Sequence, residues 1–167
     1  MDPNLRGRLA HYAKRGWHGR HWYRNLRRYA ARRYGPASQV WLACFALTSP
    51  NCSVSSNYGL ADKALKQWQT GAPFTGYLPQ VIRDLEAFRR NPAYRPAGLK
   101  VRAFTLNLMG NHYAVTIDRW IGRAAGLNDI PRGRTRQTLE MEIRILAELT
   151  GTTPAEMQAA IWTGVRS

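Results

Sequence analysis

The chain has 167 residues, of which 44% are hydrophobic, enough to build a folded core in one domain or two small lobes. This composition excludes a disordered tail. Lysine and arginine number 25 against 10 aspartate and glutamate residues, which gives a formal net charge of +15. Such an excess favours a polyanionic partner, most commonly nucleic acid, but a packaging or ribosome-like role would produce the same charge.

Other residue types limit the cofactors and the location. The two cysteines, Cys44 and Cys52, exclude a disulfide framework and a four-cysteine iron–sulfur or zinc site. The longest apolar run, residues 40–47, is far shorter than the roughly 20 residues of a membrane span. No signal peptide is visible. We therefore expect no metal, no cofactor and no membrane, and a cytoplasmic location in a bacterial or phage-infected cell.

The spacing of apolar residues predicts an all-α protein without a dependable strand. Asp2-Pro3 is typical of an N-cap followed by proline, and Ser38, Asp118 and Thr153 are further predicted caps, the last in a capping box with Glu156. The expected helices cover a segment containing Leu5, Leu9 and Tyr12, and then residues 20–34, 40–47, 54–68, 78–90, 99–109, 119–125, 135–149 and 154–163.

Basic charge is concentrated near the N-terminus. No acidic residue occurs between Pro3 and Ala61, whereas ten basic residues lie from Arg6 to Arg33. The predicted helix 20–34 puts its apolar residues on one face and its arginines on the rest. We predict that four of these arginines contact DNA phosphates, namely Arg24, Arg27, Arg28 and Arg32. The alternative is that the interleaved aromatic residues only bury one side of amphipathic helices.

Two residues further along are candidates for chemistry. Lys100 follows a Pro-Ala-Gly turn at the start of a predicted helix, where the positive end of the helix disfavours an ammonium and favours a nucleophilic amine. Gly98 lets the backbone approach another molecule closely. Asp118 follows a loop of small residues. The simpler interpretations are a surface charge for Lys100 and an N-cap alone for Asp118.

The segments around these two residues resemble the endonuclease III branch of the helix-hairpin-helix DNA glycosylases. In that family a hairpin ending in Gly-x-Lys opens a helix, and a Val-x-Val-Asp-type segment carries the essential aspartate. Here the two segments are Gly98-Leu99-Lys100 and Val115-Thr116-Ile117-Asp118, and the aspartate lies 18 residues after the lysine. Upstream, residues 45–51 and 54–65 are similar to the family's Leu-Ser-x-Gln turn and the helix after it, and the likeness covers about residues 38–126.

The resemblance implies a fold and a reaction. The fold is two helical lobes around a DNA-binding cleft, with residues 1–37 packing on a C-terminal lobe of residues 118–167, and residues 38–117 forming a helical barrel lobe with a hairpin-like turn at 94–100. The lysine amine would attack the sugar of an extruded nucleotide, displace the base and form a Schiff base, assisted by the aspartate. Catalysis is thus assigned to Lys100 and Asp118, and DNA contact to Pro50, Asn51, Gly98 and Arg102 besides the four arginines.

Three functions remain open at this point. The first is a DNA glycosylase with associated lyase activity, acting as a monomer on duplex DNA without sequence preference, in a compact form suggestive of a phage or mobile element. The second is a non-catalytic DNA-binding protein on the same fold, favoured because residues 91–98 are too few for the first helix of the family's hairpin. The third is a same-fold enzyme of DNA base hypermodification or of free nucleosides.

Overall fold

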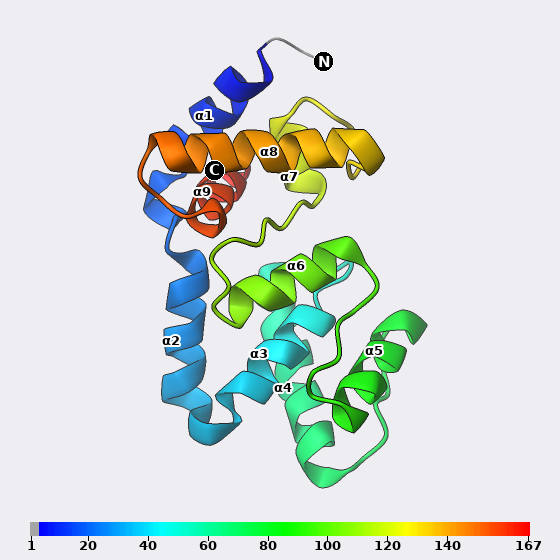
Figure 1. Ribbon diagram of the computed structural model, residues 1–167. Helices are drawn as coiled ribbons and strands as arrows, with labels where there is room; N and C mark the ends of the chain where they lie inside the picture. Colours follow the sequence, from blue (N-terminus) through cyan, green and yellow to red (C-terminus); the bar gives the residue numbers. More distant parts are fainter. Residues whose placement is uncertain (1–3) are drawn as a thin grey trace. The chain divides into compact units, whose positions relative to one another are not determined.

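The computed structural model describes residues 4–167, and these residues form helices and loops with no strand, so the protein is all-α. The predicted cap at Asp2-Pro3 lies outside the described residues. Two short 3-10 helices, η1 (Trp17–Gly19) and η2 (Gly35–Ala37), accompany the α-helices. Figure 1 shows these as α1 (Leu5–Arg15), α2 (Trp22–Tyr34), α3 (Ser38–Leu47), α4 (Val54–Thr70), α5 (Pro79–Arg90), α6 (Leu99–Leu108), α7 (Arg119–Ala124), α8 (Gly133–Leu149) and α9 (Pro154–Arg166).

The helix boundaries agree with the local signals in most places. The capping box of Thr153 and Glu156 is present at α9, and Asp118 caps α7. The predicted cap at Ser38 is wrong, because η2 runs directly into α3 and makes Ser38 the first helical residue, behind an N-cap residue, Ala37, already in helical conformation. Helix α8 begins at Gly133, two residues before the predicted start, and α9 continues to Arg166.

The described residues form two compact units. One contains residues 4–25 and 110–167, and the other contains residues 26–109. The chain passes from one unit to the other within α2, after Asn25, and again after Met109. From the sequence, we had expected the lobe boundaries after residues 37 and 117.

The unit of residues 26–109 is built around α3. All seven residues from Trp41 to Leu47 are buried, with at most 2% of each exposed, so this helix is apolar on every side. Helices α4, α5 and α6 pack against it. The segment 91–98 between α5 and α6 holds turns and no helix, so Lys100 follows an irregular connector.

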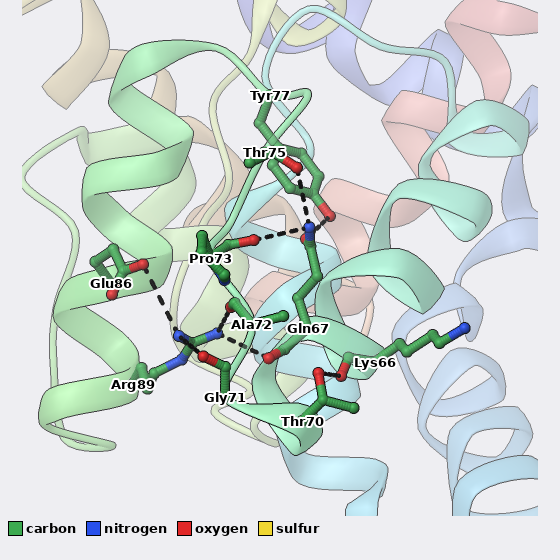
Figure 2. A network of polar contacts seen from close by, with 10 residues as sticks. All are labelled: Lys66, Gln67, Thr70, Gly71, Ala72, Pro73, Thr75, Tyr77, Glu86 and Arg89. Atoms are coloured by element: carbon green, nitrogen blue, oxygen red, sulfur yellow. Dashed lines mark hydrogen bonds and ion pairs between the residues drawn. The ribbon is translucent and has the colours of Figure 1, made fainter.

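An arginine fastens the loop between α4 and α5 in this unit, as Figure 2 shows. Arg89 donates hydrogen bonds to the carbonyl oxygens of Gln67 (2.9 Å) and Ala72 (2.7 Å), and its guanidinium lies 4.0 Å from the ring centroid of Phe74. Gln67 in turn donates to the carbonyl oxygen of Pro73 and accepts from the Tyr77 hydroxyl. These contacts satisfy carbonyls at and beyond the end of α4, so Arg89 is a structural arginine.

The other unit is built around α9, which packs against α1, α7 and α8. Its approach to α1 depends on glycines. A Cβ at Gly164 would collide with the carbonyl oxygen of Tyr12, and a Cβ at Gly16 would collide with that of Ala160. The N-terminus of α1 is tied to α8 by Arg6, whose Nε lies 2.6 Å from the carboxylate of Glu142. Asp118 belongs to this unit.

Candidate functional site

Lys100 is the second residue of α6, and its surroundings are open on the side of the backbone. Gly98 is the N-cap residue and supplies no capping side chain. Its φ of −66° suits any residue, so the glycine is not required by the backbone conformation. A Cβ built at Gly98 would meet no atom within 4 Å. The entry to α6 can therefore be approached closely by another molecule.

The amine of Lys100 is directed at the turn that follows α3. Its Nζ donates a 2.9 Å hydrogen bond to Oγ of Ser49 and lies 5.2 Å from the ring centroid of Phe104, one helical turn further along α6. The side chain is half-buried. The other lysines, Lys14, Lys63 and Lys66, are all exposed. The amine of Lys63 also lies 5.2 Å from a ring centroid, that of Tyr77, whereas Lys100 combines a ring contact with a hydrogen bond to a side chain.

The turn after α3, which contains Ser49, is stabilised by hydrogen bonds between buried polar groups. Thr48 donates through its hydroxyl to Oδ1 of Asn57 (2.7 Å), and Asn57 donates to the carbonyl oxygen of Phe45 (2.7 Å). At the tip, Pro50 is half-buried, and Asn51 is exposed with a φ of 58°, in the left-handed region that asparagine tolerates. The predicted DNA-contacting pair Pro50-Asn51 therefore lies in the same turn as the residue that binds Lys100.

Cys52 is a neighbour of Lys100 that was not predicted from the sequence to belong to the site. Its Sγ lies 3.4 Å from the carbonyl oxygen of Thr48. Burial raises the pKa of the Cys52 thiol above its ordinary value, and the positive charge of Lys100 acts in the opposite direction. The charge of Lys100 therefore affects the pKa of this thiol. A lone cysteine in a polar turn carries no sequence signal that would have shown this.

Asp118, in the other unit, caps α7, and both oxygens of its carboxylate accept hydrogen bonds. Oδ1 accepts from the backbone amides of Trp120 (2.9 Å) and Ile121 (3.0 Å), and Oδ2 accepts from Nε1 of Trp162 in α9 (3.1 Å). The capping role was expected from the sequence, but the indole partner 44 residues away was not. Tyr23 also lies near: burial chiefly, and the negative charge of Asp118 in addition, keep its pKa well above the ordinary value.

The predicted phosphate-contacting arginines differ in their surroundings. Arg24, Arg28 and Arg32 are four residues apart along α2, and all three are exposed. Arg27 is half-buried and donates to the carbonyl oxygen of Asn107 in α6 (2.9 Å), so part of its hydrogen-bonding capacity serves the fold. Arg102, two residues after Lys100, is exposed.

Residues 4–167 contain neither a metal-binding cluster nor a membrane-spanning helix. Within residues 4–167, no three side chains of histidine, cysteine, aspartate or glutamate gather in a way that could hold a metal ion. In the same part of the chain, no helix combines the length and the apolar character needed to cross a bilayer.

The family of the chain follows from comparison with known proteins. Residues 12–167 match a family of unknown function, DUF7178, and the protein belongs to that family. Neither the curated proteins nor the solved structures give a match. Function is therefore inferred from the residues described above.

Proposed function

We propose that the protein is a DNA glycosylase with lyase chemistry, in which Lys100 is the nucleophile and Asp118 assists. The observation that carries the proposal is the hydrogen bond between Nζ of Lys100 and Oγ of Ser49. It joins the Gly-x-Lys segment to the Ser49-Pro50-Asn51 turn, the two parts that the glycosylase resemblance assigns to the nucleophile and to the space left by an extruded base. These parts lie 51 residues apart in the chain.

The reaction would proceed by displacement at the sugar. The neutral amine of Lys100 forms a bond to the anomeric carbon as the glycosidic bond breaks, and the departing base takes up a proton. In the resulting adduct the bond between the anomeric carbon and the ring oxygen breaks while nitrogen loses a proton and the ring oxygen takes one up. This gives a Schiff base, from which elimination can cleave the strand. The carboxylate of Asp118 would stabilise the positive charge that develops on the sugar. The nucleotide has to leave the base stack for this attack.

The surroundings of Lys100 suit a phosphate backbone. The open space over Gly98 allows close approach, and the amides at the start of α6 receive no bond from a capping side chain of Gly98. Helix N-termini of this kind favour anions. Exposed Arg102 adds a positive charge beside them, and Arg24, Arg28 and Arg32 along α2 would contact phosphates without reading the sequence.

A second function, non-catalytic DNA binding, is favoured by one observation. All three hydrogen bonds of the Asp118 carboxylate serve the fold of its own unit, through two amides of α7 and the indole of Trp162. An aspartate with only this role would leave Lys100 without a catalytic partner. The two functions differ in whether a covalent DNA complex forms.

The test is borohydride trapping on a panel of oligonucleotides that carry an abasic site or a damaged or modified base. The proposal expects a covalent adduct, located at Lys100 by peptide mapping. Asp118→Asn should still be trapped on an abasic site, where no base has to leave, but should release an intact base much more slowly. Salt-sensitive duplex binding without any adduct across the panel would favour the non-catalytic function.

A further inference from the structure

Three arginines gather over one indole ring in the unit that contains Asp118. The guanidinium carbons of Arg119, Arg123 and Arg166 lie 5.6, 4.6 and 5.6 Å from the ring centroid of Trp120. Arg166 also lies 4.2 Å from the ring centroid of Trp162. We call these five residues the arginine–tryptophan patch. It joins α7 to the end of α9, and none of its members was predicted from the sequence to contact DNA.

The positive charge of this patch is poorly compensated. All three arginines are exposed, and within residues 4–167 none of them forms an ion pair. The carboxylate that contacts the two indole residues is that of Asp118, and its hydrogen bonds go to two backbone amides and to Nε1 of Trp162. Within the described residues, Asp118 therefore forms no ion pair with any of the three guanidinium groups, and its carboxylate is bonded to N–H groups of its own unit.

Like charges held this close repel one another. Because all three guanidinium groups lie over the same ring, their separations are no larger than the order of the Debye length at 0.1 M salt, about 10 Å. Each cation–π contact at an exposed site stabilises the fold only weakly. A bound polyanion would relieve the repulsion. Guanidinium groups can make paired hydrogen bonds with phosphate, and none of these three forms an ion pair with a carboxylate within residues 4–167.

The surroundings favour nucleic acid over a membrane surface. Proteins that lie on bilayers insert exposed apolar side chains beside their basic residues. The two tryptophans here are half-buried beneath arginines. The large exposed hydrophobic residues of this unit, namely Tyr113, Ile130, Met141 and Leu149, are not members of the patch.

We propose that the arginine–tryptophan patch binds the phosphodiester backbone of DNA, as a contact surface additional to α2 and to the start of α6. The inference rests on the proposed function only for its partner, DNA, and not on the chemistry of Lys100. Asp118, which is hydrogen-bonded to both tryptophans of the patch, would be brought to the DNA by the same contact.

The experiment measures the affinity for a short duplex between about 50 and 200 mM salt. Log affinity falls with log salt with a slope of about −0.9 per phosphate neutralised. The variant Arg119→Gln/Arg123→Gln/Arg166→Gln should flatten the slope by about 2 to 3 units. The matched control replaces three exposed arginines outside the patch, Arg83, Arg90 and Arg134, by glutamine and should change the slope by less than about one unit.

The outcomes separate DNA contact at the patch from a general effect of charge and from membrane binding. Equal flattening in both triple variants would mean that only net charge matters, and an unchanged slope in the patch variant would exclude DNA contact there; either result overturns the inference. Binding to anionic phospholipid vesicles that the patch variant loses, with its DNA slope intact, overturns it in favour of a membrane. If circular dichroism shows that the triple variant is unfolded, Arg123→Gln alone should still flatten the slope by about 0.9.

The same titration keeps this inference distinct from the proposed enzyme activity. Suppose that the wild-type protein gives no borohydride adduct but the patch variant has the flattened salt slope. The glycosylase proposal then fails, and the inference that the patch contacts DNA stands. If an adduct forms at Lys100 and the slope of the patch variant is unchanged, the glycosylase proposal stands and the patch fails.

Discussion

Nζ of Lys100 donates a 2.9 Å hydrogen bond to Oγ of Ser49, and this contact joins the start of α6 to the turn after α3. The two residues are 51 positions apart in the chain. The turn is held by the buried pair of Thr48 and Asn57, so the position of the serine hydroxyl is defined by the core of its unit. The amine is therefore held by the packing of the unit as well as by its own helix.

The first prediction concerns Ser49 as a positioning residue. Ser49→Ala removes the acceptor that holds the amine of Lys100, so trapping on an abasic site should slow by about tenfold, the equivalent of about 1.4 kcal/mol. Duplex affinity should be unchanged, and Ser49→Thr, which keeps a hydroxyl, should restore most of the rate. Single-turnover trapping across a range of pH measures this. A rate and pH profile identical to those of the wild-type protein would show that the contact has no part in the reaction.

The second prediction uses Cys52 to report the charge of Lys100. Burial raises the pKa of the Cys52 thiol and the lysine lowers it, so Lys100→Met should raise that pKa further. Alkylation of Cys52 by iodoacetamide near pH 8 to 9 should then be slower, because the thiolate is the reactive form. Burial raises the pKa of Cys44 to about 12, so this second thiol should stay unreactive in the folded protein.

The control for this measurement is Lys66→Met, which removes an exposed lysine. It should leave the alkylation of Cys52 unchanged. Equal rates in Lys100→Met and the wild-type protein would contradict the placement of the lysine charge beside this turn.

The third prediction concerns the coupling of Asp118 to Trp162. In Asp118→Asn the new amide group has to face either the indole N–H or the two backbone amides, because all three partners are donors. We expect a loss of about 1–2 kcal/mol in the free energy of unfolding. Trp162→Phe removes the indole donor. Its cost in unfolding free energy should therefore be smaller in the Asp118→Asn background than in the wild-type protein. Denaturant unfolding of the four proteins measures the coupling, and strictly additive losses would argue against it.

The fourth prediction is a pH dependence of stability through Glu156. Burial raises the pKa of this carboxyl, but hydrogen bonds from Thr153 and the neighbouring His21 outweigh burial, and the net pKa lies below its ordinary value of 4.5. A carboxyl with a lowered pKa in the folded state stabilises the fold fully above its unfolded value and loses this contribution as the pH falls through the folded value. The unfolding free energy should therefore decrease below about pH 4.5.

Glu156→Gln should make this acid dependence less steep, since glutamine does not titrate but keeps an oxygen for the amide of Thr153. Glu148→Gln, at an exposed position in α8, is the control and should leave the dependence as it is. If the unfolding free energy of Glu156→Gln falls as steeply in acid as that of the wild-type protein, titration of the capping box does not contribute to the pH dependence.

Local signals in the sequence predicted the helices well. The capping box of Thr153 and Glu156 and the cap at Asp118 need only residues within one turn, and both are present. Ser38 was misjudged because a capping residue type does not cap when a 3-10 helix leads directly into the helix. The apolar run 40–47 is typical of a buried helix; residues 41–47 are buried at the centre of their unit, and Val40 is half-buried.

The contacts within the candidate sites could not be read from the sequence. Ser49 with Lys100, and Trp162 with Asp118, are separated by 51 and 44 residues, so each contact depends on how whole helices pack. The same holds for Arg166, which reaches the ring of Trp120 from the end of α9. The charge pattern of the sequence predicts DNA contact for the arginines of α2 but does not point to this second group, because three arginines spread over two distant segments form no run in the sequence.

The most direct test of the proposed chemistry is Lys100→Ala in the borohydride assay. The chain has four lysines, and Lys14→Ala, Lys63→Ala and Lys66→Ala serve as matched controls. We expect Lys100→Ala to abolish the adduct with abasic DNA while its duplex affinity stays within about one log unit, since at most one phosphate contact is lost. The three control variants should be trapped like the wild-type protein. An undiminished adduct in Lys100→Ala would contradict the assignment of Lys100 as the nucleophile.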